Sequence, residues 1–146
     1  MIALLQRVQS ASVSVASNEI AHIGQGLLVF IGIERDDTDA QANRLLTRLL
    51  GYRIFNDQDD KMNLSLNDIG GGLLLVPQFT LAADTDKGMR PSFSSAAPPQ
   101  QGESLFDYLS LQAKQQYDLV EIGQFGADMQ VSLINDGPVT FWLQAN

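Results

Sequence analysis

The pattern of apolar and polar residues predicts a chain made mostly of short strands. Apolar and polar residues alternate in Ser12-Val13-Ser14-Val15, and Ser17-Asn18 supplies turn chemistry before a return strand. The run from Gly26 to Ile33 is continuously apolar, which is typical of a central strand buried on both faces. By the same reasoning we predict strands over residues 2–8, 11–15, 19–23, 26–33, 73–76, 119–125, 128–134 and 139–143, and an extended segment over 52–55.

Two amphipathic helices accompany the strands. Asp36-Asp37-Thr38-Asp39 offers capping side chains and negative charge suited to a helix N-terminus. Apolar residues then recur at three-to-four spacing, so a helix over residues 37–51 is predicted to pack one face on the sheet. A second helix begins at Pro98-Pro99 and extends through Ala113. Residues 82–100 lack periodicity, and long irregular excursions of this kind often carry function.

These elements predict one domain over residues 1–146 with an α/β fold of the α+β type. Its centre is a strongly curved, barrel-like and mainly antiparallel sheet, with the two helices packed outside. Pro77 follows the apolar strand 73–76. Because proline donates no hydrogen bond to a ladder, Pro77 has to lie at a strand end or on an edge.

The composition excludes several classes of catalytic and metal-binding site. The chain has no cysteine, which excludes disulfides, thiolate nucleophiles and cysteine-ligated metal centres. Its single histidine, His22, falls on the polar face of a predicted strand without a nucleophile motif nearby, and we interpret it as a surface residue. The polar turn 56–60 lacks the glycine and glutamate of a calcium loop, and Gly70-Gly71-Gly72 lacks the lysine of a phosphate loop. No metal or cofactor is expected, and the remaining catalytic groups are hydroxyls, carboxylates, amides and the backbone.

Hydropathy and charge limit the partners. No apolar run approaches the roughly eighteen residues that span a bilayer, and the N-terminal charge, Arg7, follows the apolar residues, the reverse of a secretory signal. We therefore expect a cytoplasmic protein without a membrane partner. The net charge of −8 limits any nucleic-acid interface to a small footprint, because affinity for phosphates comes largely from lysine and arginine. Arg44, Arg48 and Arg53 form either a local basic patch or ordinary ion pairs with nearby acids.

Two short segments hold the most specific information. Gln78-Phe79-Thr80-Leu81 follows a predicted buried strand, and Gly137-Pro138-Val139-Thr140 leads into the last one. A Gly-Pro pair is a rigid backbone element that can present carbonyl oxygens at a fixed angle. On the residues alone, this pair is a turn before the final strand with a trans bond.

Both segments resemble the signature segments of the D-aminoacyl-tRNA deacylases, usually Ser-Gln-Phe-Thr-Leu and Asn/Asp-Gly-Pro-Val-Thr. Three further segments are similar to that family in the expected order: Ile2–Val8, Gly51–Phe55 and Met89–Phe93. The resemblance spans nearly the whole chain. It implies the same curved-sheet fold, a homodimer, no cofactor, and hydrolysis of the ester bond of D-aminoacyl-tRNA. The implied partner is a tRNA acceptor end carrying a D-amino acid or glycine, and no DNA.

The implied reaction can be carried out by the catalytic groups that the composition leaves, which are hydroxyls, carboxylates, amides and the backbone. An aminoacyl ester is already activated, so its hydrolysis needs a positioned water and a stabilised oxyanion more than a strong nucleophile. The backbone N–H groups of Phe79 and Thr80 are candidate oxyanion donors, and the Gln78 amide is a candidate to orient the ester or the water. Thr80 acts as a nucleophile, a base or a hydrogen-bond donor, and a covalent acyl-enzyme is the least favoured because no base adjoins it. Phe79 either stacks on the terminal adenine or faces the core, and the core-facing position is favoured.

The resemblance also implies how chirality is distinguished. The Gly137-Pro138 bond would be cis, and the pair would enter the active site of the other subunit with its carbonyl oxygens facing the α-carbon of the bound amino acid. A D-residue is then accepted, an L-residue collides with the backbone, and glycine is expected to pass. Arg7 either holds the dipeptide by hydrogen bonds to its backbone or forms an ordinary surface salt bridge.

One position departs from the family pattern, and two other functions stay open. Pro77 stands where the family usually has serine. Because proline restricts Val76 to extended conformations, we expect the loop geometry and the activity to be retained. The alternatives are a non-catalytic nucleic-acid-binding module on the same fold and a related deacylase with relaxed chirality.

Overall fold

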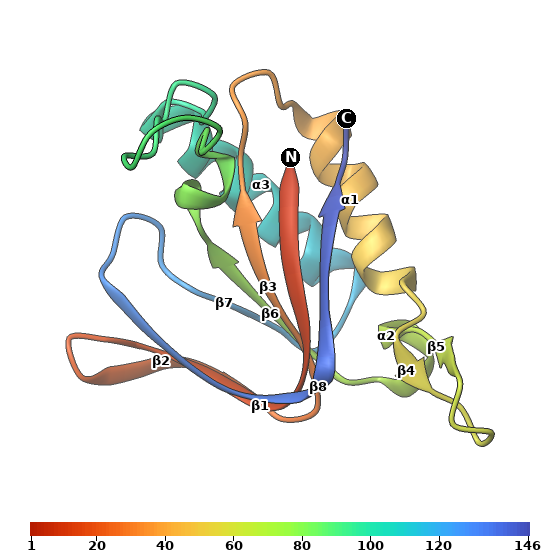
Figure 1. Cartoon of the computed structure of the whole chain (residues 1–146). Coiled ribbons are helices and arrows are strands. Elements are labelled where there is room, and N and C mark those ends of the chain that lie inside the picture. The colour runs from red at the N-terminus through yellow and green to blue at the C-terminus, as the bar shows by residue number, and fades with distance from the viewer.

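The computed structural model describes the whole chain, residues 1–146, as a curved sheet backed by helices (Figure 1). The strands are β1 (Ile2–Val15), β2 (Asn18–Ile23), β3 (Gly26–Gly32), β4 (Phe55–Asn56), β5 (Met62–Leu64), β6 (Gly72–Pro77), β7 (Val120–Ile122) and β8 (Met129–Gln144). The helices are α1 (Asp39–Gly51), α2 (Leu66–Ile69), the 3₁₀ helix η1 (Phe79–Ala82) and α3 (Pro99–Gln116).

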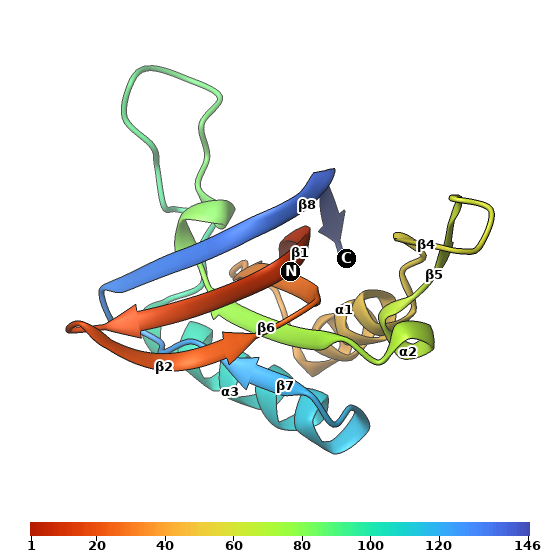
Figure 2. The ribbon, with the colours of Figure 1, turned by 90° about the horizontal axis from the view of Figure 1, so that it is seen from below.

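The long strand β1 organises the sheet because it pairs with β2, β3 and β8. Its first half lies antiparallel to β3, its second half lies antiparallel to β2, and β8 runs antiparallel along nearly its whole length. On the other side of β3, β6 and β7 continue the sheet in parallel. Figures 1 and 2 show that β1 and β8 curve together across the front of the molecule. The predicted α+β fold with a strongly curved, mainly antiparallel sheet is confirmed.

Alternating side chains divide the core into two clusters, one on each face of the sheet. Leu5 and Val29 belong to the larger cluster, which also contains the buried residues of α1 and α3. Val13, Leu28 and Leu74 belong to the smaller cluster on the opposite face. Because Leu28 and Val29 are neighbours in β3 and belong to different clusters, β3 is buried on both faces, as its continuous apolar run predicts.

Local capping explains where the two predicted helices begin. Thr38 is the N-cap of α1, and its side chain and that of Gln41 form a capping box with each other's backbone N–H groups. α3 begins at Pro99, where the missing N–H of proline breaks no hydrogen bond. Both helices are confirmed to within a few residues. No helix is both long and apolar enough to cross a membrane.

Several boundaries differ from the prediction. Residues 2–15 form one strand rather than two, and so do residues 129–144, because irregularities shift their register without ending the pairing. β7 is shorter than predicted. The expectation of only two helices is wrong, because it missed η1 and the single turn α2, which is held by a capping box between Ser65 and Asp68.

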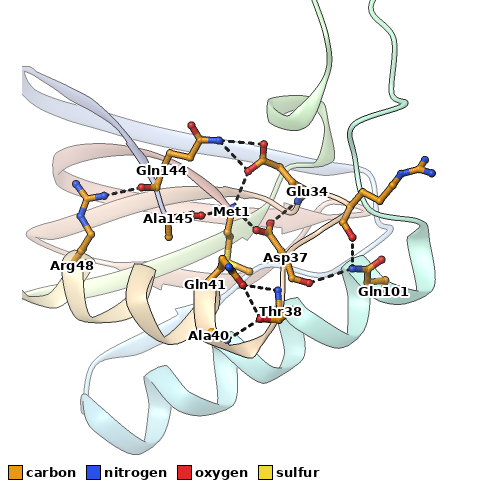
Figure 3. Close-up of polar contacts among 11 residues, drawn as sticks. Met1, Glu34, Asp37, Thr38, Ala40, Gln41, Arg48, Gln101, Gln144 and Ala145 are labelled. Carbon is orange, nitrogen blue, oxygen red and sulfur yellow. Dashed lines mark hydrogen bonds and ion pairs between the residues drawn. The ribbon is translucent and has the colours of Figure 1, made fainter.

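The N-terminal ammonium group ties the two ends of the chain together (Figure 3). Met1 is fully buried, and its ammonium donates to Asp37 at 2.5 Å, to Glu34 at 2.8 Å and to the Ala145 carbonyl at 2.9 Å. Burial raises the pKa of Glu34, but hydrogen bonds from Met1 and Gln144 outweigh it and leave that pKa below its ordinary value. The cluster fixes the loop between β3 and α1 against the start of β1.

Candidate active site

Gln78, Phe79 and Thr80 stand where β6 ends. The Gln78 N–H donates to the Ile31 carbonyl at 2.8 Å, which continues the pairing with β3 past the end of β6. The chain then turns into η1, and its first bond runs from the Leu81 N–H to the Gln78 carbonyl at 3.2 Å. Because helical bonding begins there, the N–H groups of Phe79 and Thr80 have no acceptor within the chain.

The side chains of Gln78 and Thr80 contact each other. Gln78 Nε2 donates to Thr80 Oγ1 at 2.5 Å, which occupies a lone pair of the hydroxyl and leaves its proton free to donate. No histidine or carboxylate accepts a hydrogen bond from this hydroxyl. The structure therefore offers no general base that would convert Thr80 into a nucleophile.

An open cavity of about 1120 Å³ begins at this strand end. Gln78 and Phe79 line one part of it, and Phe93 and Ala96 from the excursion line another. The remaining walls come from Ile31, Ile33 and Arg35 at and after the end of β3, from the start of α3, and from residues 125–130, which lead into β8. Of the predicted catalytic pair, Gln78 faces the cavity, whereas Thr80 is not part of its lining.

The irregular segment predicted over residues 82–100 is confirmed between η1 and α3. Figure 2 shows the loop standing away from the body of the molecule. Its return is fixed to η1 and to the residue after β3, because the Ser95 hydroxyl donates to the Ala82 carbonyl at 2.5 Å and the Ala97 N–H donates to the Ile33 carbonyl at 3.0 Å. The excursion thereby forms a wall of the cavity.

The favoured core-facing position of Phe79 is wrong. The side chain is 60% exposed, and its ring lies 5.1 Å from that of Phe93 at an interplanar angle of 51°. Phe79 comes after the last buried residue of β6, Val76, at a point where the alternation of the strand no longer applies. Two aromatic rings at the edge of an open cavity suit the stacking of a nucleobase.

Gly137 and Pro138 form an exposed bulge inside β8. Residues 136–139 stand opposite the single residue Arg7 of β1 in the pairing of the two strands. The interpretation as a turn between two strands is therefore wrong. The Gly137-Pro138 bond is cis, as the family resemblance implies.

The Asn135 side chain closes the base of this bulge. Its Nδ2 donates to the carbonyl oxygens of Arg7 and Val139, both at 3.0 Å. A Cβ atom on Gly137 would lie 2.1 Å from Asn135 Oδ1. Glycine is therefore the residue that fits beside this amide.

Arg7 is buried beneath the bulge with only 8% of its surface exposed. Its Nε donates to the Asp136 carbonyl at 3.0 Å, and one terminal nitrogen donates to the Ile54 carbonyl at 2.8 Å and to Asn56 Oδ1 at 3.2 Å. Nε also lies 3.1 Å from the Asp136 carboxylate. Both interpretations of Arg7 thus hold in part, because it pairs with a carboxylate and also binds the carbonyl that precedes Gly137.

The structure gathers the predicted site residues into two separate groups. Gln78 is bonded to Ile31, which lies opposite Ala3 of β1, whereas the bulge lies opposite Arg7. Four residues of strand separate these two positions, or about 13 Å at ~3.3 Å per residue. Neither residue of the Gly-Pro pair nor Arg7 lines the cavity.

The other residues considered from the sequence lie outside both groups. His22 is an exposed strand residue, as predicted. Arg48 and Arg53 donate to backbone carbonyl oxygens, and neither they nor Arg44 form an ion pair, so the interpretation as ion pairs with acids is wrong. In the polar turn, hydrogen bonds from the Asn63 side chain and then from backbone N–H groups hold the pKa of Asp57 below its ordinary value.

Sequence reasoning missed two residues that shape these groups. Asn135 supports the bulge from outside the Gly-Pro segment, and no periodic pattern points to it. Phe93 belongs to a segment similar to the deacylase family, Met89–Phe93, but the sequence gives it no role. Both act through contacts with residues distant in the chain, which local patterns do not report.

Comparisons with known proteins agree with the fold and with the family resemblance. Residues 4–144 match the family described as D-Tyr-tRNA(Tyr) deacylase. A Pseudomonas fluorescens protein named D-aminoacyl-tRNA deacylase is 62% identical over 144 residues, which cover 99% of each chain. A Klebsiella pneumoniae protein of the same name is 58% identical over 99% of each chain.

Two solved structures show the same fold. A protein named c-Myc DNA Unwinding Element Binding Protein superposes with a TM-score of 0.96 at 38% identity, over 100% of this chain and 99% of that one. A probable eukaryotic D-amino acid tRNA deacylase superposes with a TM-score of 0.85 at 20% identity, over 97% of each chain, which supports the fold alone. On the full-length family match and the identity to its relatives, this chain belongs to the D-Tyr-tRNA(Tyr) deacylase family.

Proposed function

We propose that this protein hydrolyses D-aminoacyl-tRNA and glycyl-tRNA, and that the Gly137-Pro138 bulge of a second copy excludes L-aminoacyl groups. The family and its relatives support the reaction class, which is that of a D-aminoacyl-tRNA deacylase, a hydrolase of the aminoacyl ester. The observation that carries the finer proposal is the separation of the two groups of site residues within one chain.

The N–H groups of Phe79 and Thr80 supply the oxyanion site in this proposal. They are adjacent, they lack acceptors in the chain, and Phe79 lines the cavity. As water attacks the ester carbon, its carbonyl oxygen becomes negative and accepts hydrogen bonds from these donors. The bond between the ester carbon and the ribose oxygen then breaks, and the leaving ribose oxygen takes the proton lost by the water and becomes a free hydroxyl.

Gln78 orients the reacting groups. Its side chain lines the cavity and is held by the bond to Thr80, so its amide oxygen keeps a fixed direction. Such positioning lowers the entropic part of the barrier without requiring a strong base. The ribose hydroxyl next to the ester is available to assist the proton transfer, which is consistent with the absence of a histidine or carboxylate partner for Thr80.

In this proposal the Gly-Pro bulge distinguishes D- from L-aminoacyl groups by steric exclusion. Gly137 and Pro138 are both exposed, and the bulge is braced from beneath by Arg7 and Asn135. A rigid backbone placed close to the α-carbon leaves room for hydrogen on that side and excludes an L side chain. Glycine has no side chain to exclude, so glycyl-tRNA is a substrate in the same proposal.

A second copy is needed because the bulge of one chain lies about 13 Å along β1 from the strand end that carries Gln78, by ~3.3 Å per residue. Two-fold dimers place the same two surfaces in contact reciprocally, so each bulge would meet the other chain's cavity. One dimer then contains two complete sites.

A second candidate function is nucleic-acid binding without hydrolysis. It is favoured by the name of one structural neighbour, c-Myc DNA Unwinding Element Binding Protein, which is 38% identical to this chain. The net charge of −8 disfavours it, because non-specific binding to DNA depends on many lysine and arginine contacts with phosphates.

A Thr80→Val variant is expected to keep its turnover number within about tenfold of the wild-type value, because the main-chain donors and the substrate hydroxyl remain. Single-turnover deacylation of D-Tyr-tRNA measures this. Thr47→Val, the same change on the exposed face of α1, serves as the control. A loss on the order of a thousandfold in Thr80→Val alone would assign the chemistry to the hydroxyl instead.

Cross-linking tests whether the bulge reaches the other chain's cavity. The chain has no cysteine, so Phe79→Cys and Asp136→Cys can be prepared separately, mixed and treated with a short bifunctional maleimide. We expect a product of dimer mass that joins positions 79 and 136. Lys114→Cys mixed with Phe79→Cys should give no such product. Absence of the 79–136 link would count against the proposed dimer.

A further inference from the structure

Arg35 is the only basic side chain that lines the cavity. The lining contains one other charged residue, Asp128, which lies in the segment before β8. Arg35 is exposed, and its guanidinium forms neither an ion pair nor a hydrogen bond within the chain. In a protein with a net charge of −8, a cation without an acidic partner at the edge of a cavity points to an anionic ligand.

The backbone of Arg35 is fixed although its side chain is free. Its N–H donates to the Ser95 carbonyl at 3.0 Å, and its carbonyl accepts from Gln101 Nε2 at 2.9 Å. The residue before it, Glu34, is bound to the ammonium group of Met1 at 2.8 Å (Figure 3). Only the side chain of Arg35, and not its backbone, then has to be ordered when a ligand binds, which limits the entropic cost of binding.

The rest of the lining suits a nucleoside. Phe79, Phe93 and Phe125 contribute aromatic surface, and Gln78 contributes a polar group. The start of α3 also borders the cavity, and the positive end of its dipole adds to the attraction for an anion. Aromatic surface for a base next to a free guanidinium is the combination that a nucleotide requires.

We propose that Arg35 binds the 5′-phosphate of the terminal nucleotide of the tRNA while its nucleoside occupies the cavity. The proposal rests on the proposed function, because it uses the same cavity for the same substrate. The aminoacyl ester itself carries no negative charge, so the backbone phosphate is the anion that enters with it. Arg35 is a binding residue here, acting on affinity and not on the ester bond.

Two small substrates test this role directly. One is 3′-O-(D-tyrosyl)adenosine, and the other is the same compound with a 5′-phosphate. For the wild-type protein we expect the phosphate to lower KM by about tenfold at unchanged kcat, as a charge-assisted contact would. In Arg35→Gln the two substrates should have equal KM values, whereas Arg35→Lys should retain part of the difference.

The control is Lys114→Gln, which changes the net charge by the same amount. Lys114 is exposed and lies fifteen residues along α3 from Pro99, or about 22 Å at ~1.5 Å per residue. It should behave like the wild type. A phosphate effect that persists in Arg35→Gln, or that disappears equally in Lys114→Gln, would overturn the proposal.

Binding measurements separate this proposal from the proposed function. Calorimetric titration with AMP and with adenosine needs no turnover, so it decides the role of Arg35 even if the protein cleaves neither substrate. We expect AMP to bind the wild type about tenfold more tightly than adenosine, with the difference decreasing at high salt and absent in Arg35→Gln. Equal affinities of the wild type for AMP and adenosine would refute the phosphate contact.

Discussion

Arg7→Leu is expected to release the Gly-Pro bulge and to make L-aminoacyl-tRNA a detectable substrate. The guanidinium is buried and donates to the carbonyl oxygens of Asp136 and Ile54 and to the Asn56 side chain. Leucine fills part of the space but leaves these acceptors unpaired, at a cost of about 3 kcal/mol in the free energy of unfolding. We expect the ratio of D- to L-tyrosyl-tRNA hydrolysis to fall by about tenfold or more, because ~1.4 kcal/mol of lost exclusion is sufficient for that.

Asp136→Asn is the matched control for Arg7. It removes the ion pair at 3.1 Å but keeps the carbonyl that accepts from Arg7 Nε. The Asp136 side chain is 39% exposed, so the pair contributes at most about 1 kcal/mol. Urea denaturation and the D/L ratio should both stay near the wild-type values. If Asp136→Asn were as damaging as Arg7→Leu, the ion pair and not the backbone bond would be the function of Arg7.

Asp37→Asn is expected to lower the free energy of unfolding by about 3 kcal/mol. The Asp37 carboxylate is 5% exposed, receives the buried ammonium of Met1 and also accepts from the Glu34 N–H at 2.7 Å. A neutral amide in its place leaves the buried ammonium of Met1 with Glu34 as its only anionic partner. For a chain of this length the corresponding fall in Tm is about 10 °C, which calorimetry detects easily.

Glu34→Gln should be milder, and its effect should depend on pH. The Glu34 side chain is 29% exposed, so we expect a loss of about 1 kcal/mol near neutral pH. Because the pKa of Glu34 is lowered in the folded protein, its contribution is complete above the ordinary carboxyl pKa and is lost as the pH falls through the lowered value. Wild type and Glu34→Gln should therefore converge in acid. A difference between them that grows on acidification would contradict this assignment.

Elements set by local chemistry could be predicted from the sequence. α1 follows from the capping residue Thr38 and the apolar spacing behind it, and β3 follows from its continuous apolar run. α2 was also accessible, because Ser65-Leu66-Asn67-Asp68 has the spacing of a capping box. Strand boundaries that depend on pairing with a distant strand were harder to predict. Gln9 is an extra residue of β1 between the pairs Val8–Asn135 and Ser10–Ile134. It changes the phase of alternation along β1, and such a change resembles the end of a strand.

In the candidate site, too, the residues of a contiguous motif could be predicted, and the residues that act through tertiary contacts could not. Gln78 and Thr80 could be chosen from the sequence because their motif is contiguous, and the structure joins their side chains. The position of Phe79 could not, because its neighbour Phe93 comes from the irregular excursion. The backing of the bulge by Asn135 and the free guanidinium of Arg35 depend on tertiary contacts that no local pattern encodes.

Matched D- and L-tyrosyl-tRNA, compared as substrates of the wild-type protein with glycyl-tRNA alongside, show whether the protein hydrolyses by chirality. Release of the amino acid is followed over time at equal concentrations of the three substrates. We expect hydrolysis of the D-tyrosyl and glycyl esters, while the L-tyrosyl ester decays only at its uncatalysed rate. Equal cleavage of both tyrosyl esters, or of neither, would contradict this expectation.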